Sequence, residues 1–396
     1  MRGKQILILL ALFFAVALEW GLLIYIISKP EGEVRPAAPP LVMSARFIAP
    51  EEGVVLFQGQ RVTVEVEAPP LELTGAELWL NGHRAFPLPQ SMARFPNRWI
   101  VTFLWEPSAS AAYTLEATIK TTQGNVLKTP PLTLEVVPPL YLCFASDSAG
   151  NYDIYRMRAD GALLEALIAS PAEERKPSQA PDGSIAFAKG DEIWIKGRDG
   201  LKFLVKGQEP SFDPKGRYLA FRSNVSLAQE LFLLDLRQGI TQQLTSEYSF
   251  AGQASWSPDG ERIAFAALKD GNWDVYIIQK DGGGLVRLTD HPSQDWYPAW
   301  SPDGQKIAFV SSRDGSHQLY LVNPDGSGLE RLTQIPRGVE GPTFSPDGRL
   351  LAFTAYTGEG KGFSAREIHL LSLGTRRVWR ITRDSFDETD VTWCSP

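Results

Sequence analysis

Histidine and cysteine are the residues with which this chain could most readily bind a metal or react covalently, and both are scarce. The sequence contains four histidines and two cysteines. His291 and His317 lie in loops that should open on one face of the molecule, and His369 lies within a predicted strand. Two loop histidines without a third ligand make a weak metal site, so we expect neither a metal ion nor another cofactor.

Catalytic motifs are also missing from the sequence. There is no G-x-S-x-G nucleophile elbow, no H-E-x-x-H motif, no C-x-x-C pair and no glycine-rich phosphate loop. Several aspartates recur, but each lies in a P-D-G or D-G turn, where the carboxylate hydrogen-bonds to nearby backbone amides. We therefore expect a structural role for Asp259, Asp281, Asp303, Asp325 and Asp347.

These turns belong to a longer repeat. The sequence Ser-Pro-Asp-Gly begins at residues 257, 301 and 345, which are 44 residues apart, and weaker copies begin at Ala180 and Asp213. An apolar strand of the form I-A-F or L-A-F follows each turn, and Leu142-Cys-Phe144 is a further copy of it. Two more strands follow, as in DVYIIQ and LVRLT, so each copy predicts four antiparallel strands, which is one blade of a β-propeller.

The repeated residues resemble those of TolB-type, WD-repeat-like β-propellers. The resemblance rests on the S-P-D-G turn, the I-A-F strand and the two strands after it, and it implies a six-bladed propeller over residues 139–396. TolB itself has a small α/β domain before its propeller, which this sequence does not predict. The resemblance therefore implies the propeller fold without membership of the Tol-Pal system.

The segment before the propeller predicts a second all-β unit. Residues 42–138 contain short strand signals separated by turn formers, including the hairpin signal Asn81-Gly82. Seven strands in about 100 residues are typical of an immunoglobulin-like sandwich, and the Y-x-L-x-A pattern at Tyr113 resembles bacterial immunoglobulin-like domains. The predicted fold class is all-β: a six-bladed β-propeller plus an N-terminal immunoglobulin-like β-sandwich, with one N-terminal transmembrane helix.

The N-terminal segment differs from the rest of the chain. Residues 6–27 are almost unbroken apolar sequence, about 33 Å long as a helix against a hydrocarbon core of about 30 Å. Arg2 and Lys4 precede it, so residues 1–5 are expected in the cytoplasm and residues 28–41 form a proline-rich linker outside. The expected protein is membrane-anchored and extracytoplasmic, in the periplasm or on the outer cell surface. A signal peptide cleaved after Ala15-Val16-Ala17 is the alternative.

The loops that lead into the first strand of each blade predict a binding surface. They carry acids and aromatic residues that should lie near one end of the propeller axis, and the last blade has a glycine-rich insertion from Tyr356 to Arg366. We expect a protein or peptide partner at this end, and the acids should attract a basic one. The candidate partner-binding residues are Glu174, Tyr248, Asp295, Trp296, Glu340, Phe386, Asp387, Glu388 and Asp390.

Two classes of function remain open on the sequence. The first is a non-catalytic binding or scaffold protein, and the alternative is a propeller enzyme, a lyase or hydrolase, that acts on a glycan or peptide. We favour the first because the enzyme motifs are missing. The 39 basic and 46 acidic side chains give a net charge of −7 and no basic surface for nucleic acid.

The C-terminal sequence VTWCSP aligns with ASWSP and PAWSP, the strands that precede two of the turns. The first blade lacks such a strand, so we expect the C-terminal strand to pair with residues 140–146 and close the ring of blades. Cys143 and Cys394 would then share one face if they lie opposite each other or are offset by two residues. Outside the cytoplasm, a disulfide between them is expected.

Overall fold

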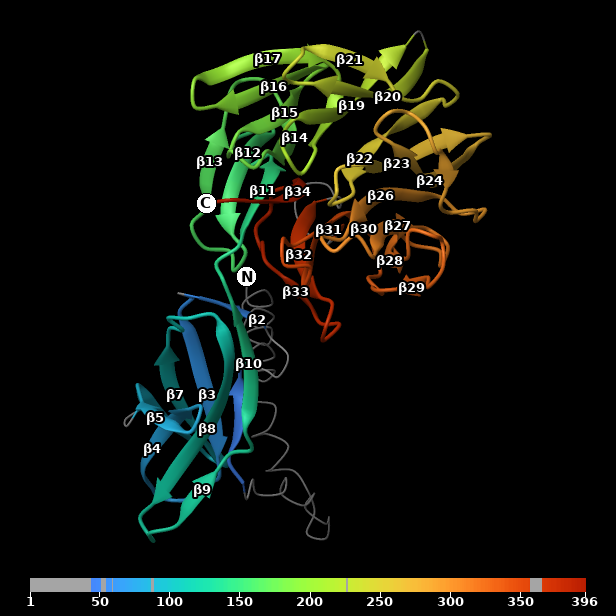
Figure 1. The fold of residues 1–396 in the computed structure, drawn as a ribbon. Coiled ribbons are helices and arrows are strands. Elements are labelled where there is room, and N and C mark those ends of the chain that lie inside the picture. Colours follow the sequence, from blue (N-terminus) through green and yellow to red (C-terminus); the bar gives the residue numbers. More distant parts are fainter. Residues whose placement is uncertain (1–43, 51–54, 59, 87–88, 226, 357–364) are drawn as a thin grey trace, which may run out of the picture.

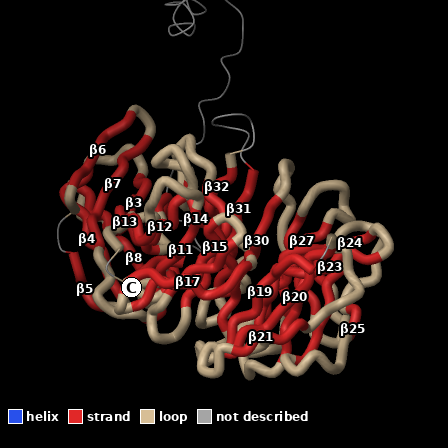
Figure 2. Tube along the Cα trace, turned by 90° about the horizontal axis from the view of Figure 1, so that it is seen from above, coloured by secondary structure: helices blue, strands red, loops and turns tan. Residues whose placement is uncertain are grey.

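The computed structural model describes residues 44–396, except for 51–54, 59, 87–88, 226 and 357–364. Strands, turns and loops make up this described part, and Figure 2 shows them without a helix. The all-β prediction is thus confirmed for these residues. None of them forms a helix long and apolar enough to cross a membrane. The predicted membrane segment 6–27, the tip 1–5 and the linker 28–41 lie outside the described residues, as does most of the insertion after Tyr356.

The first unit is a β-sandwich of two sheets. Its strands are β1 (Arg46–Ala49), β2 (Val55–Phe57), β3 (Val62–Ala68), β4 (Leu73–Leu80), β5 (His83–Phe86), β6 (Ser91–Phe95), β7 (Arg98–Trp105), β8 (Ala111–Thr121), β9 (Val126–Lys128) and β10 (Leu132–Val137). One sheet has the order β1-β3-β7-β6, and the other has the order β2-β10-β8-β4-β5, with β9 beside β8. Their inner faces bury an apolar core that includes Val64, Leu78, Phe103 and Ile119.

Local signals in the sandwich sequence correspond to recognisable features. The turn at Asn81-Gly82 joins β4 to β5, with Leu80 paired to His83. The hydroxyl of Tyr113 donates a hydrogen bond of 3.1 Å to the carbonyl of Ala109, as in a tyrosine corner. The sequence did not predict the short strands β5, β6 and β9. The assignment of this sandwich to the immunoglobulin-like class stays a prediction.

The second unit consists of antiparallel sheets (Figure 1). Its strands are β11 (Tyr141–Ser146), β12 (Asp153–Arg158), β13 (Glu165–Ile168), β14 (Glu174–Gln179), β15 (Ile185–Lys189), β16 (Glu192–Gly197), β17 (Gly200–Lys206), β18 (Gln208–Phe212), β19 (Tyr218–Val225), β20 (Ala228–Asp235), β21 (Ile240–Gln243), β22 (Phe250–Trp256), β23 (Arg262–Lys269), β24 (Asn272–Gln279), β25 (Val286–Arg287), β26 (Asp295–Trp300), β27 (Ile307–Ser311), β28 (Gln318–Val322), β29 (Glu330–Arg331), β30 (Val339–Phe344), β31 (Leu350–Tyr356), β32 (Arg366–Ser372), β33 (Val378–Arg380) and β34 (Glu388–Cys394).

These strands fall into consecutive runs of four. Separate four-stranded sheets are formed by β34-β11-β12-β13, β14 to β17, β26 to β29 and β30 to β33 in the described chain. The runs β18 to β21 and β22 to β25 are joined into one sheet by a single parallel pair, Gln229 and Phe250. The first strands β34, β14, β18, β22, β26 and β30 contact one another in this order, and β30 contacts β34 again. They therefore surround a common axis.

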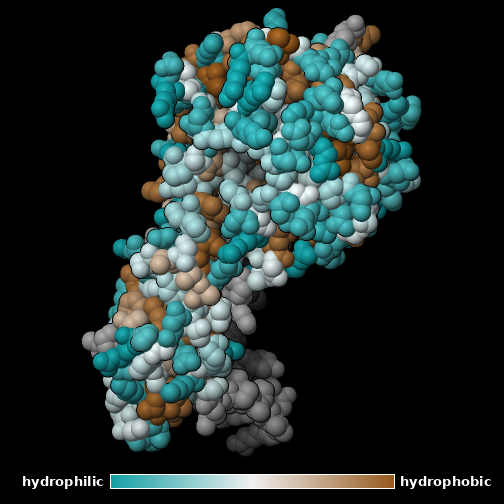
Figure 3. Space-filling view, viewed as in Figure 1, coloured by the Kyte–Doolittle hydropathy of each residue, from teal (hydrophilic) through white to brown (hydrophobic). Residues whose placement is uncertain are grey.

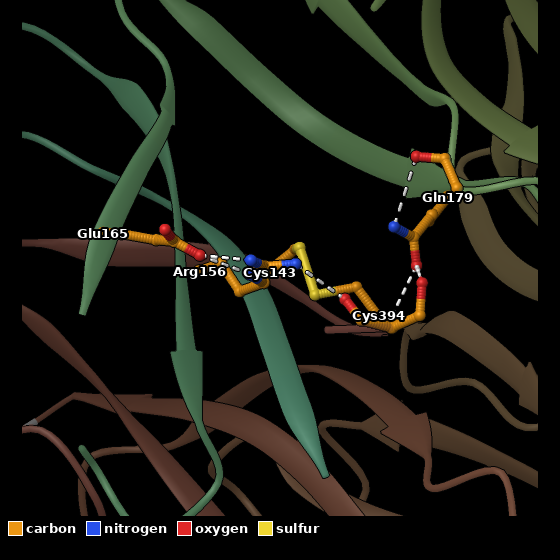
Figure 4. Close-up of a disulfide and its surroundings, with 7 residues drawn as sticks. Cys143, Arg156, Glu165, Gln179 and Cys394 are labelled. Atoms are coloured by element: carbon orange, nitrogen blue, oxygen red, sulfur yellow. Dashed lines mark hydrogen bonds and ion pairs between the residues drawn. A yellow bond between two sulfur atoms is a disulfide. The ribbon is translucent and has the colours of Figure 1, made fainter. Parts of the chain in front are cut away.

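The C-terminal strand supplies the first strand of the run that begins with β11. Cys394 pairs with Tyr141, and Thr392 pairs with Cys143, so the two cysteines are offset by two residues on adjacent strands. Their Cα atoms are 5.8 Å apart and a disulfide joins them (Figure 4). Next to it, both the amide and the hydroxyl of Ser395 donate hydrogen bonds to the side chain of Gln179 on β14. The chain end is thus fixed to strands on both sides.

The sandwich packs directly against the propeller. Phe57 and Val137 of the sandwich are 1% exposed and belong to the same apolar cluster as Leu142 and Leu350 of the propeller. An ion pair between Glu135 and Arg349 lies beside this cluster. Because apolar burial holds the two units together, their packing does not depend on the chain connection alone.

Candidate functional site

Each first strand contains a β-bulge at an equivalent position. In β14, Lys176 and Pro177 lie opposite the single residue Phe187 of β15, because the register shifts between Arg175 and Ser178. The opposing phenylalanine is in every case the buried F of the repeated I-A-F strand. The other bulges are Glu209-Pro210 opposite Phe221, Gln253-Ala254 opposite Phe265, Tyr297-Pro298 opposite Phe309, Gly341-Pro342 opposite Phe353, and Asp390-Val391 opposite Phe144.

The first residue of each bulge adopts a left-handed backbone conformation. We call these the ring residues: Lys176, Glu209, Gln253, Tyr297, Gly341 and Asp390, with φ values of 56°, 55°, 56°, 50°, 57° and 58°. Only Gly341 among them is a glycine. This conformation costs a residue with a side chain about 1–2 kcal/mol, and such strained positions cluster at functional sites.

Hydrogen bonds connect neighbouring ring residues. The backbone amide of Gln253 donates to Oε2 of Glu209 at 2.9 Å, and the amide of Tyr297 donates to Oε1 of Gln253 at 2.9 Å. The amide of Lys176 lies 3.4 Å from Oδ2 of Asp390 in the same relationship. A ring side chain with an acceptor therefore holds the bulge of the next strand in place.

The ring residues line a cavity of about 160 Å³ at one end of the axis. The second bulge residues, four of them prolines, line the same cavity and form an apolar neck. A second cavity of about 810 Å³ shares Ala254, Pro298 and Pro342 with the first and extends to Trp256 and Cys394. The first strands thus line a channel in which the cavity beside the ring, which we call the channel mouth, adjoins a wider chamber.

An ion pair occupies part of the ring. Nζ of Lys176 lies 2.6 Å from Oδ1 of Asp390, and the two side chains are 31% and 4% exposed. Burial opposes the charge on Lys176, but Asp390, Tyr297 and Glu209 outweigh it and raise the pKa of this lysine. Burial would raise the pKa of Asp390, but the charge of Lys176 lowers it below its ordinary value. Both groups are therefore charged at neutral pH.

A second polar network borders the ring and is centred on Arg366. Its guanidinium lies 2.9 Å from Glu340 and 2.7 Å from Asp387. The hydroxyl of Tyr356 donates to Glu340, and that of Tyr152 donates to Asp387. Arg366 therefore forms ion pairs with two of the predicted partner-binding acids and joins β32 to the segment before β34.

Several predicted binding residues are not at an accessible surface, and this part of the sequence prediction was wrong. Glu174, Tyr248, Asp295 and Glu388 are at most 5% exposed. Asp295 pairs with Arg313 at 3.1 Å, and Glu388 accepts a hydrogen bond from Thr382 at 3.0 Å. These side chains contact neighbouring strands, so they stabilise the fold and are not exposed to a partner.

The remaining predicted residues lie in three environments. Glu340 and Asp390 line the cavity, and Asp387 reaches it through Arg366. Trp296 is half-buried against His317, with ring centroids 4.8 Å apart. Phe386 is also half-buried, next to the Arg366 network. The predicted acids that meet at the channel therefore come from β30 and from β34 with the segment before it, and Glu209 of β18 joins them there.

Lys176, Gln253 and Tyr297 were not among the binding residues predicted from the sequence. The sequence does contain a signal for the ring residues, which always stand four places before the position of the serine in the S-P-D-G turn. The aligned segments, each beginning with its ring residue, are KPSQAP, EPSFDP, QASWSP, YPAWSP, GPTFSP and DVTWCS. The residue types at this position differ from strand to strand, whereas the surrounding residues repeat. A position that varies inside an otherwise repeated segment could therefore have indicated a binding role from the sequence alone.

The histidines do not form a metal site. His291 accepts a hydrogen bond from the amide of Ser293, and His369 is stacked on Phe353, where burial lowers its pKa to about 4. Within the described residues, no group of three His, Cys, Asp or Glu side chains is placed to hold a metal ion. The predicted turn aspartates have the local role expected of them, as Asp259 accepts hydrogen bonds from Ser257 and Glu261.

Comparisons with known proteins agree on the fold. Residues 205–393 match the family model of the TolB beta propeller domain, and no curated protein sequence matches the chain. TolB from Acinetobacter baumannii is 17% identical, with 72% of this chain and 80% of that chain covered and a TM-score of 0.58.

Two further structures show that this fold serves different proteins. A chain of the nidogen/laminin complex is 12% identical, with 65% of this chain and 98% of that chain covered and a TM-score of 0.52. Hydrazine synthase from Kuenenia stuttgartiensis is 15% identical, with 65% of this chain and 46% of that chain covered and a TM-score of 0.52. At these identities the likeness concerns the fold alone. Together with the family match over residues 205–393, it shows that the second unit of this chain resembles the β-propellers of TolB.

Proposed function

We propose that this protein is a non-catalytic binding or scaffold protein whose six-bladed, TolB-like propeller binds a protein or peptide partner at the channel mouth. The observation that carries the proposal is the ring: five side chains held at strained backbone positions line an open cavity. Strain of about 1–2 kcal/mol per residue recurs at these positions, and strained positions cluster at functional sites. It is consistent with selection for side chains that face a ligand.

The shape and composition of the channel support a peptide. An extended peptide can present polar and apolar groups in alternation. Its polar groups could contact the ring residues, and its apolar groups could contact the prolines that follow them. The described surface in Figure 3 is mostly hydrophilic, with small apolar patches. A chain of similar fold is part of the nidogen/laminin complex, so this fold occurs in protein assemblies.

The proposal includes the location of the protein. We propose that residues 6–27 hold the chain in the membrane and that the immunoglobulin-like sandwich and the propeller lie outside the cytoplasm. The basic residues Arg2 and Lys4 before the apolar segment and the Cys143–Cys394 disulfide both support this orientation. Recovery of the mature chain from the soluble extracytoplasmic fraction, starting after Ala17, would favour the cleaved signal peptide.

A blocked channel tests the binding proposal. Gly341 has φ +57° and lines the cavity, and a Cβ there would meet no atom within 4 Å, so we expect Gly341→Phe to place a ring in the cavity. Gly239→Phe is the matched control, because Gly239 also has positive φ and open space but lies in the β20–β21 turn. Peptides selected from a random displayed library on the wild-type full-length protein provide the probe.

We expect Gly341→Phe to weaken binding of the selected peptides at least about tenfold, because the mouth is filled, and Gly239→Phe to leave it unchanged. Fluorescence polarisation measures both affinities, and thermal unfolding verifies that the two variants are folded. Equal binding to wild type and Gly341→Phe would show that the channel mouth is not the site. Failure to select any peptide would count against a peptide-binding function.

A further inference from the structure

Each acid at the channel mouth has a basic side chain beside it. Oε2 of Glu209 lies 3.3 Å from the guanidinium of Arg222 and accepts the amide of Gln253. Asp390 is paired with Lys176, and Glu340 is paired with Arg366. A ligand that enters the ring therefore meets ion pairs and not free carboxylates. This arrangement removes the reason to expect a basic partner.

Several of the uncommitted polar groups in the ring are hydrogen-bond donors. Lys176 has three N–H donors and directs one at Asp390. Nε2 of Gln253 and the hydroxyl of Tyr297 have no hydrogen-bond partner among the described residues. Burial raises the pKa of Tyr297 and, with the acids Glu340, Asp390 and Glu209, outweighs the opposing charge of Lys176, so the hydroxyl keeps its proton and can donate.

These donors converge although they belong to different strands. Lys176 extends from β14 until its Nζ lies 5.4 Å from the ring centroid of Tyr297 on β26. Gln253 on β22 is joined to Tyr297 through the hydrogen bond from the Tyr297 amide. All three side chains line the same cavity of about 160 Å³, which is large enough for a carboxylate and a short stem.

We propose that the ring binds a carboxylate group of an extended peptide, through Lys176, Gln253 and Tyr297. This inference rests on the proposed function and specifies the chemistry of the partner. An ammonium, a carboxamide N–H and a phenol O–H are suitable donors for the oxygens of a carboxylate, and hydrogen bonds to a charged group are the stronger kind. The carboxylate belongs either to the C-terminus of the peptide or to an Asp or Glu side chain.

The test compares pools of fluorescein-labelled hexapeptides by fluorescence polarisation with the full-length protein. The first pool consists of uncharged residues with a free C-terminal carboxylate, and the second is the same pool as C-terminal amides. The third pool is amidated and has one internal Asp, and the fourth is amidated and has one internal Lys.

The protein variants are Tyr297→Phe, which removes one donor, and Lys176→Met with Asp390→Asn, which removes the ion pair without leaving a buried charge. Lys202→Met, on the exposed edge of β17, is the matched control.

We expect a carboxylate-bearing pool to bind about tenfold more tightly than the amidated uncharged pool, since hydrogen bonds to a charged group are worth about 1.5–3 kcal/mol. Tyr297→Phe and the double variant should each reduce this preference, and Lys202→Met should preserve it. Preference for the first pool assigns a C-terminus, and preference for the third assigns a side chain.

Two results would overturn the inference, and they differ in what they say about the proposed function. Equal affinity for all pools, or preference for the Lys pool, with binding still abolished by Gly341→Phe, would refute the carboxylate site and leave peptide binding intact. Absence of binding by every pool would contradict both.

Discussion

Lys176 and Asp390 form an ion pair of 2.6 Å at the channel mouth although they are 214 residues apart in sequence. Lys176 lies on β14 and Asp390 lies on β34, the C-terminal strand. Cys394, on the same strand as Asp390, is bonded to Cys143 of β11. The C-terminal strand is therefore held by a covalent bond on one side and by an ion pair on the other.

Removal of the lysine charge should destabilise the protein. Lys176→Met leaves the carboxylate of Asp390, which is 4% exposed, without its cation. We expect the free energy of unfolding to fall by about 2 kcal/mol, less than for a fully buried pair because Lys176 retains some contact with water. Urea denaturation measures the change. Addition of Asp390→Asn should recover most of the loss, and no recovery would show that Lys176 acts by packing and not by charge.

Glu388 should make stability depend on pH. Burial, together with the nearby carboxylate of Asp384, raises the pKa of Glu388 to about 9 in the folded protein. The folded state therefore keeps a proton that the unfolded state loses above about pH 4.5, so this residue lowers stability as pH rises from 4.5 towards 9.

Glu388→Gln should remove this dependence. We expect the variant to be about 2 kcal/mol more stable than wild type near pH 8 and similar to it near pH 5. Urea denaturation at both pH values checks the prediction. A constant difference between the two proteins across this range would mean that Glu388 is already ionised in the folded state.

Reduction of the disulfide should lower the melting temperature. Cys143 and Cys394 are 251 residues apart in sequence, and in the loop-entropy model a bridge of that span contributes at most about 5 kcal/mol. We expect a measurable decrease of up to about 10–20 °C, because each kcal/mol shifts the melting temperature of a large domain by about 2–4 °C. The double variant Cys143→Ser, Cys394→Ser should melt like the reduced wild type and be insensitive to reductant. An unchanged melting temperature would show that hydrogen bonding and packing alone hold β34.

Two glycines near the first strands should differ in how strongly substitution destabilises the protein. A Cβ at Gly207 would lie 2.5 Å from the ring of Phe221 and 2.7 Å from the carbonyl oxygen of Arg222, whereas one at Gly341 would meet nothing within 4 Å. We expect Gly207→Ala to cost about 3 kcal/mol through overpacking and Gly341→Ala about 1 kcal/mol through its left-handed backbone. Thermal or urea unfolding compares them, and similar losses would mean that backbone conformation outweighs steric contact.

The sequence by itself determined the repeating architecture of the propeller. The S-P-D-G turn and the I-A-F strand are local signals, since turn geometry and strand alternation depend on residues close in the chain. They were sufficient to assign VTWCSP to the strand that pairs with β11, and hence to bring Cys143 and Cys394 together. The same local logic predicted the hairpin at Asn81-Gly82.

Only the tertiary structure decided which polar groups face the channel. A β-bulge is a relation between two strands, and the direction of its side chain depends on the neighbouring strands as well, so single segments did not reveal Lys176, Gln253 or Tyr297 as ring residues. The pairing of charges is equally non-local, because Arg313 forms an ion pair with Asp295, and Arg366 forms ion pairs with Glu340 and Asp387. A sequence shows that acids are numerous near the ends of strands, but their exposure depends on partners that only the packed fold brings within 4 Å.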